Sequence, residues 1–322
     1  MYLIRNFTLS ALLIAGLASC EPDQTNPNNL PSAGTYSSLP ATLQAFAAPV
    51  QLLNVNADSG GRYQLARGTQ LIIPQGAFRN LNGDTTHGTV QITFAEYLDR
   101  SEMIYSNILT DNVDTNETIS INANSAGAFY IQAAQNGFGI NIRPEVGVGV
   151  YLPQRNLIAA NQPGISLAGY YGVKNDKPIG IVDWTPSSRP NLTYSVAFDT
   201  VAYGFDTLGY HQAAQPFNFF GGTDTVRFSV GGANGITEQN SFVYLLPKGM
   251  RSVIDMGSAP RLRNRFFMVQ NLVDVHLVSV AVVNGRFYGG ITSTKLENRK
   301  SYSVNLQETD PAAFKTAILN LP

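Results

Sequence analysis

Short stretches of alternating apolar and polar residues, separated by turn residues, recur along most of the chain. Val90, Ile92 and Phe94, for example, alternate with polar or small residues, which is the pattern of a strand with one buried face. Similar segments recur at a spacing of roughly ten residues, which predicts an all-β protein built from β-sandwiches. The other predicted strands lie at 52–55, 71–73, 118–121, 127–133, 138–142, 146–153, 179–184, 194–198, 224–230, 242–247, 273–283, 286–291 and 302–306.

Local turn and cap residues indicate hairpin turns between some of these strands and a helix near the C-terminus. Asn136-Gly137 and Asn284-Gly285 are hairpin signals, because both residues of a type I′ turn need a positive φ. Asp310 followed by Pro311 is typical of a helix start. A short C-terminal helix is therefore predicted, with one face formed by Phe314, Ala317, Ile318 and Leu321.

Composition along the chain predicts four segments. Residues 1–19 have a basic residue followed by an apolar run, as in a signal peptide. Residues 20–47 are rich in Pro, Asn and Ser, and we expect a disordered tether. Two β-sandwich domains in tandem are predicted beyond it, at 48–160 and at 161–322, with the C-terminal helix in the second.

The end of the apolar run carries a recognisable pattern. Leu17-Ala18-Ser19-Cys20 resembles the lipobox of bacterial lipoproteins, which implies that Cys20 becomes the first mature residue and carries acyl chains. An ordinary secretory signal ending at Ser19 is the alternative. Glu21 and Asp23 resemble the export signal of surface lipoproteins in Bacteroidetes-type bacteria. These resemblances imply an outer-membrane lipoprotein exposed at the cell surface.

A second resemblance lies in the first predicted sandwich. Gly60-Gly61, then Ile73-Pro74-Gln75-Gly76-Ala77-Phe78, then an alternating strand resemble the opening of ZU5-type domains. Pro74 ends a strand and Gly76 supplies a permissive backbone, so these residues shape the fold. The resemblance implies a β-sandwich that binds proteins, in a branch of Bacteroidetes envelope proteins of unassigned role.

Charge and cysteine content narrow the classes of function. The formal net charge is −1 and only 13% of residues are charged, so nothing in the sequence indicates a nucleic-acid partner. Cys20 is the one cysteine, which excludes a disulfide or a Cys-based metal site in the mature fold. No cofactor is expected, and we predict a protein without enzymatic activity because no catalytic motif is recognisable.

Three sets of polar residues are candidates for chemical sites. Glu96, Asp99 and Glu102 are expected to be solvated charges at a strand end. His87, His211 and His276 stand in unlike contexts and are expected to be isolated polar residues. The oxygen-bearing residues Asn112, Asp114 and Asn116 alternate as calcium ligands do, but Glu117 replaces the glycine of such a loop, which favours a simple turn.

Aromatic residues gather in the second predicted domain. Filling of a sandwich core is the favoured interpretation, and a sugar- or protein-binding surface is the alternative. The alternative names the ligand-binding candidates Trp184, Tyr210, Phe217 and Phe219. The sequence thus predicts a lipid-anchored cell-envelope protein that is tied to the membrane through Cys20 and binds another envelope protein. The alternative is a surface glycan-binding lipoprotein.

Overall fold

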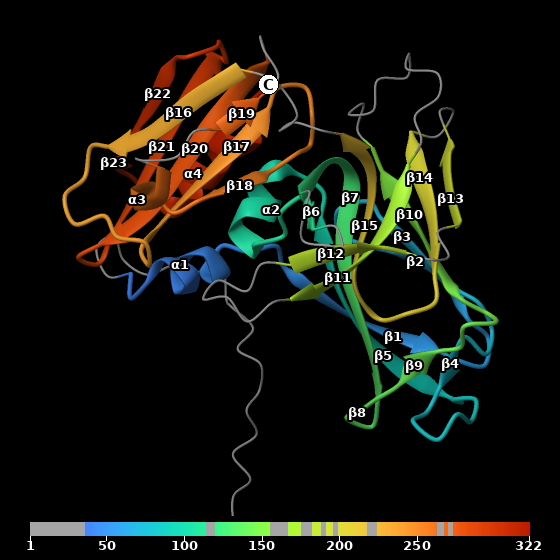
Figure 1. Ribbon diagram of the computed structural model, residues 1–322. Helices are drawn as coiled ribbons and strands as arrows, with labels where there is room; N and C mark the ends of the chain where they lie inside the picture. Colours follow the sequence, from blue (N-terminus) through green and yellow to red (C-terminus); the bar gives the residue numbers. More distant parts are fainter. Residues whose placement is uncertain are drawn as a thin grey trace, which may run out of the picture.

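The structure is a computed structural model, and Figure 1 shows its strands arranged in two sandwiches beside each other. This arrangement confirms the prediction of an all-β protein with a short C-terminal helix. The described residues are 36–113, 120–154, 167–174, 182–187, 191–195, 199–217, 224–262, 267–269 and 273–322.

The first sandwich packs a large sheet against a smaller one. Their facing side chains, including Phe94, Phe129 and Tyr203, form one apolar cluster. In sheet order, the eight-stranded sheet contains β1 (Val50–Asn56), β5 (Thr89–Tyr97), β7 (Ser120–Gln135), β15 (Gly209–Phe217), β11 (Ala168–Lys174), β12 (Val182–Pro186) and β6 (Asp111–Val113), with β8 (Phe138–Gly139) paired to β7. The five-stranded sheet contains, in order, β13 (Asn191–Ser195), β14 (Thr200–Phe205), β10 (Val148–Pro153), β3 (Gln70–Ile73) and β2 (Gly61–Gln64). A separate two-stranded sheet is formed by β4 (Phe78–Arg79) and β9 (Asn141–Ile142).

The second sandwich has its own apolar cluster, which includes Phe228, Leu245 and Leu277. Its five-stranded sheet contains, in order, β18 (Ile254–Gly257), β17 (Ser241–Pro247), β20 (Asp274–Val283), β21 (Arg286–Lys295) and β23 (Gln307–Glu308). Its three-stranded sheet contains β19 (Phe267–Val269), β16 (Asp224–Gly231) and β22 (Ser301–Asn305).

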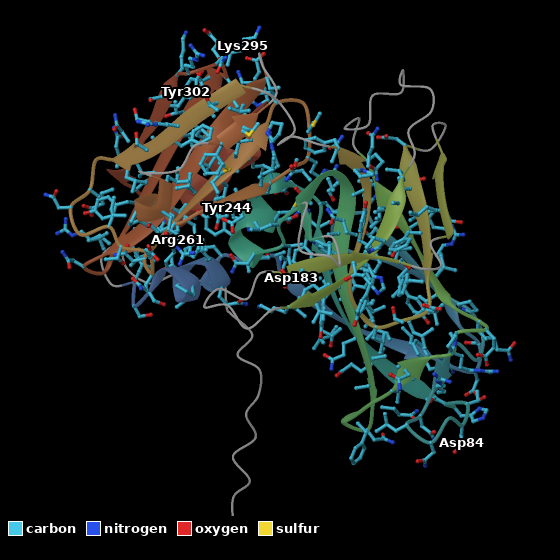
Figure 2. The ribbon with its side chains drawn as sticks, viewed as in Figure 1. Asp84, Asp183, Tyr244, Arg261, Lys295 and Tyr302 are labelled. Atoms are coloured by element: carbon cyan, nitrogen blue, oxygen red, sulfur yellow. The ribbon has the colours of Figure 1, made fainter. Side chains whose placement is uncertain are left out.

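A third apolar cluster joins the two sandwiches, and we call it the junction. It combines the outer face of the eight-stranded sheet, the face of the second sandwich that carries Tyr244, and three helices. Figure 2 shows Tyr244 on the side of the second sandwich that faces α2. The helices in the described residues are α1 (Leu39–Ala45), α2 (Arg100–Ser106), α3 (Ala259–Leu262) and α4 (Pro311–Leu319), of which α1, α2 and α4 contribute to the junction.

A loop of the second sandwich also enters the first one at the junction. Arg251 is fully buried, and its guanidinium donates to the backbone carbonyls of Ala126 at 3.1 Å and Gln154 at 3.0 Å. The adjacent Val253 accepts from the backbone N–H of Thr110 at 2.9 Å. Because these bonds satisfy buried polar groups on both sides, the two sandwiches are held in one fixed arrangement.

The predicted domain boundary at 160/161 is wrong. β15 pairs antiparallel with β7 from Gly209 to Phe217, and β14 pairs with β10 along its whole length. The strands between residues 168 and 217 therefore complete the first sandwich, and the sheets divide after β15. The error arises because β10 ends at Pro153, whereas its partner strand β14 begins only at Thr200.

The predicted disordered tether at 20–47 is wrong over its final residues. Ser38 caps α1 by accepting from the backbone N–H of Ala41, and Leu39 and Leu43 of this helix are buried in the junction. Tyr36 is buried too, and its backbone N–H donates to Gly285 at 2.9 Å. A seven-residue helix is too short to be stable alone, so these tertiary contacts are what order it.

The local signals, in contrast, are confirmed. β3 ends at Ile73 and Gly76 has a φ of 64°, as the Ile-Pro-Gln-Gly-Ala turn predicts. Both central residues of each predicted hairpin turn have positive φ. They are Asn136 and Gly137 in the first turn and Asn284 and Gly285 in the second. Asp310 accepts from two backbone N–H groups at the start of α4, and Phe314 and Ile318 are buried, but Ala317 is exposed.

Candidate functional site

The outer face of the eight-stranded sheet is the surface of greatest interest. Strand partners share a face of the sheet, so the ladders place Val50, Ala95, Tyr130 and Tyr210 in one row across four strands. A second row contains Leu52, Thr93 and Gln132, and a third contains Asn54, Gln91 and Ala134. We call these residues, without the buried Ala95 and with Asn56 and Thr89 beyond them, the open face.

The junction covers only one end of this sheet face. Ala95 and Tyr97, near the end of β5, are buried beneath the helices and the second sandwich. Towards the other end, Val50 is 60% exposed and Leu52 is 52% exposed. Gln91 and Gln132 are also exposed, and Thr93 is half-buried between them. The open face therefore begins where the helical cover ends.

Two tyrosines form the aromatic part of the open face. The rings of Tyr130 and Tyr210 lie 4.7 Å apart between centroids and are inclined by 46°. The Tyr130 hydroxyl donates to Oε1 of Gln132 at 3.1 Å, which fixes the ring relative to the amide. Both rings are half-buried, and burial raises the pKa of both hydroxyls, so they stay protonated and can donate hydrogen bonds at neutral pH.

None of the residues of the open face carries a charge. Its side chains are aliphatic, aromatic, amide or hydroxyl groups, which supply apolar contact together with neutral donors and acceptors. Depletion of charge and enrichment in tyrosine are features of the cores of protein interfaces. Chemically, the face is suited to recognition of a neutral surface rather than to acid–base catalysis.

The structure places the predicted aromatic candidates in different environments. Trp184 is buried in the junction, where its Nε1–H donates to the carbonyl of Leu109 at 2.6 Å, so the prediction that it contacts a ligand is wrong. Phe217 is half-buried and packs against the core of the second sandwich. Tyr210 alone reaches the open face, and Phe219 lies outside the described residues.

Tyr130 and Gln132 were missed in the sequence although a signal was present. Phe129, Ile131 and Ala133 alternate with them, and this alternation assigns the two sets to opposite faces of one strand. Phe129 and Ile131 are fully buried in the first sandwich, which leaves Tyr130 and Gln132 facing outwards. What the sequence did not show was which strands lie beside this one.

Glu96 and Glu102 are buried and Asp99 is half-buried, so the prediction of solvated charges is wrong for Glu96 and Glu102. Glu96 accepts from the backbone N–H groups of Arg67 at 3.0 Å and Thr69 at 3.2 Å. Glu102 accepts from the backbone N–H of Leu98 and forms an ion pair with Arg67. Partners from distant segments thus compensate the loss of hydration, and the cluster is structural.

Asp99 completes this cluster at the start of α2. It accepts from the backbone N–H of Glu102 at 2.9 Å and forms an ion pair with Arg67 at 3.1 Å. A carboxylate at this position satisfies a free N–H group of the helix start and interacts favourably with the helix dipole. Asp99 and Glu102 therefore help to position α2, which covers the neighbouring part of the sheet, whereas Glu96 holds the segment of Arg67 and Thr69.

The histidines lie in separate environments, as expected. His211 is buried among aromatic rings, His276 is buried beside Ser293, and the exposed His87 pairs with Asp58. Among the described residues, no three His, Cys, Asp or Glu side chains are arranged to hold a metal ion. Asn112 lies on β6 beside Trp184, but Asp114 and Asn116 lie outside the described residues, so the calcium question stays open to experiment.

A depression of about 350 Å³ lies at one end of the five-stranded sheet of the first sandwich. Pro74 of the Ile-Pro-Gln-Gly-Ala turn lines it together with Val148, Phe205 and Asp206. Its other lining residues are proline, valine and glycine. This lining offers apolar contact and one carboxylate, and it brings no nucleophile and base together.

Comparison with known proteins gives no relative. No family model, curated protein or solved structure matches the chain. The lipobox and the ZU5-like pattern therefore stay predictions, and Cys20 lies outside the described residues. Of the helices that the structure describes, none is long and apolar enough to cross a membrane.

Proposed function

We propose that the chain is a lipid-anchored cell-envelope protein that binds another envelope protein through the open face and has no enzymatic activity. The observation that carries the proposal is the uncovered, uncharged sheet face with a half-buried tyrosine pair and two exposed aliphatic residues. Tyrosines in such settings supply large contact areas and hydroxyl donors at low entropic cost, and they recur at protein interfaces.

The rigidity of the scaffold supports this proposal. The open face lies on four neighbouring strands of an eight-stranded sheet, from the edge strand β1 to the interior strand β15, and the other face of this sheet packs in a sandwich core. Side chains on such strands lose little freedom when a partner binds, which favours affinity. The anchor at Cys20 and the segment that follows it would hold this surface close to a membrane.

Photo-cross-linking in the native envelope tests this function. A photoreactive residue in place of Gln132 should capture one envelope protein, whereas the same residue at Glu238, which is exposed on the second sandwich, should not. The captured protein, once purified, should bind the chain directly, and Tyr130→Ala with Tyr210→Ala should weaken binding by about tenfold or more. Equal capture at both positions, or unchanged affinity of the double variant, would contradict the proposal.

A neutral glycan is the second candidate ligand, and the Tyr130–Tyr210 pair is the observation that favours it. The aromatic rings can stack on the apolar faces of a sugar, and Gln91, Thr93 and Gln132 offer amide and hydroxyl groups to its hydroxyls. This candidate takes the place of the predicted platform around Trp184, which is buried. Titration of the purified chain with neutral polysaccharides, read by tyrosine fluorescence, distinguishes the two candidates.

A further inference from the structure

We infer that β1 pairs antiparallel with β1 of a second copy of this chain, joining two eight-stranded sheets edge to edge. β1 is the terminal strand in the order of its sheet. Within the described part of the chain it pairs along one side only, with β5. Its other side presents the backbone N–H and C=O groups that a further strand would use.

The sequence of β1 lacks every common device that protects an edge strand. Sheet edges are usually kept short, or they carry a charge, a proline or a bulge that prevents further pairing. β1 reads Val-Gln-Leu-Leu-Asn-Val-Asn and contains neither a charge nor a proline. Its ladder with β5 runs through seven residue pairs without a shift in register, so the edge is regular along its whole length.

In the part of the chain that the structure describes, the other edge strands of the three larger sheets are shorter, and most carry a charge. β6, at the opposite edge of the same sheet, has three residues and contains Asp111. β2 has four residues with Arg62, β18 has four with Asp255, and β23 has two with Glu308. β13 is uncharged but has five residues. Among the described edge strands of these sheets, the seven-residue β1 is therefore the longest, which fits an edge that takes part in pairing.

A second copy fits this edge because β1 is complementary to itself. In this pairing a two-fold axis passes between the Leu52 residues of the two copies. Leu52 then lies opposite Leu52 of the second copy, and Val50 lies opposite Asn54 of the second copy. Like charges would repel across such an axis, and β1 has none. The pairing also covers Leu52, which is 52% exposed in the single chain.

The pairing would join two open faces into one surface. Because the side chains of Leu52 and Val50 lie on the same sheet face as Tyr130 and Tyr210, the two tyrosine pairs would face the same side of a continuous sheet. A ligand with repeated features could then engage both copies, and its avidity would exceed the affinity of either face alone. This inference does not depend on which ligand the open face binds.

Charge complementation tests the self-pairing. Sedimentation of the purified full-length chain should show a dimer, whereas Leu52→Lys and Leu52→Glu should each raise the dimer dissociation constant by about tenfold or more. A mixture of the two variants should dimerise again, because opposite charges then meet at the two-fold axis. Restoration in the mixture is specific to a residue that faces its own copy.

Val173→Lys is the matched control, because Val173 is an exposed aliphatic residue, at 57%, on β11 and away from the edge. This variant should dimerise as the wild type does. The inference is overturned if the wild type is monomeric at all concentrations, if Leu52→Lys still dimerises, or if the mixture stays monomeric. Cross-linking of β1 to a different envelope protein, with the purified chain monomeric, would replace self-pairing by strand addition from that partner.

Discussion

His211 is enclosed by aromatic rings in the core of the first sandwich. The Phe205 and Phe129 rings lie 4.7 and 5.1 Å from the imidazole between centroids, and Tyr203 and Tyr171 complete the surroundings. The Nε2 atom lies 2.9 Å from the carbonyl of Thr207, which requires that Nε2 carry the proton of the neutral ring. Burial lowers the pKa of His211 to about 4.

This lowered pKa makes stability depend on pH. Between about pH 4 and pH 6.5 the unfolded chain binds a proton at this histidine and the folded chain does not, so stability falls as pH falls. We expect the wild type to lose about 2 kcal/mol more than His211→Phe between pH 7 and pH 5. Urea unfolding at the two pH values measures this difference, and equal losses in both proteins would show that His211 is not the source.

The buried carboxylates Glu96 and Glu102 show a related principle at single residues. Glu96 receives its hydrogen bonds from the segment that contains Arg67 and Thr69, about thirty residues earlier in the chain. A carboxylate can be buried when such donors compensate its lost hydration. These donors lie far from Glu96 and Glu102 in the sequence. The local sequence alone therefore predicted that both carboxylates are exposed to solvent.

Among the elements, α1 shows most clearly how the junction is built. Leu39 and Leu43 lie four residues apart and face the junction, and Gln44 is exposed. Lys315 of α4 donates to the carbonyl of Phe46 at 2.7 Å, just beyond the end of α1, and its ammonium lies 5.8 Å from the centre of the Tyr105 ring of α2. α1 is thus connected to both of the other junction helices.

Truncation of Leu43 should therefore destabilise the whole protein. Leu43→Ala leaves a cavity in the junction and should reduce the free energy of unfolding by about 2–5 kcal/mol. Gln44→Ala, at the exposed neighbour, should have little effect. Denaturant unfolding compares the two variants with the wild type, and equal stabilities would mean that α1 does not contribute to the fold.

On the scale of the whole molecule, the junction makes the two sandwiches one structural unit. Interfaces between domains of one chain are usually polar and permit relative motion. Here the interface is an apolar cluster that includes Trp184, Tyr105 and Tyr244, and the buried Arg251 adds hydrogen bonds to it. Neither sandwich could separate without exposing these large side chains to water.

We therefore expect thermal unfolding to occur in a single cooperative transition. In calorimetry the measured enthalpy should equal the van't Hoff enthalpy for the whole chain. Leu43→Ala should move this one transition to lower temperature without dividing it. Two resolved transitions in the wild type, one for each sandwich, would contradict the view that the junction couples them.

The sequence predicted local features well because their causes are local. Pro74 and Gly76 fix a turn through their own backbone preferences, and Asp310 caps α4 with its own side chain. The alternation in β5 likewise identifies its buried face without knowledge of its neighbours. These features required no information about distant parts of the chain.

The domain boundary and the open face depended on contacts between distant residues. Tyr130 pairs with Tyr210 across eighty positions of sequence, and no local pattern announces which strands become neighbours. Trp184 was an attractive ligand candidate because tryptophan is amphipathic, but its neighbour Leu109 comes from another segment and helps to bury it. The alternation of apolar and polar residues assigns each residue to one face of its own strand. The open face, in contrast, is formed by several strands in register, and that register cannot be read from one strand alone.

The position of α1 also determines how the molecule bears mechanical load. Tension applied on the N-terminal side of Tyr36 reaches the folded body at the junction, where Tyr36 is bonded to Gly285 and Leu39 and Leu43 are buried. The pull acts on a helix that packs against α2 and β20, and β1 and its exposed edge lie beyond it along the chain. Tension from that side would therefore load the junction before it reaches the sheet that carries the tyrosine pair.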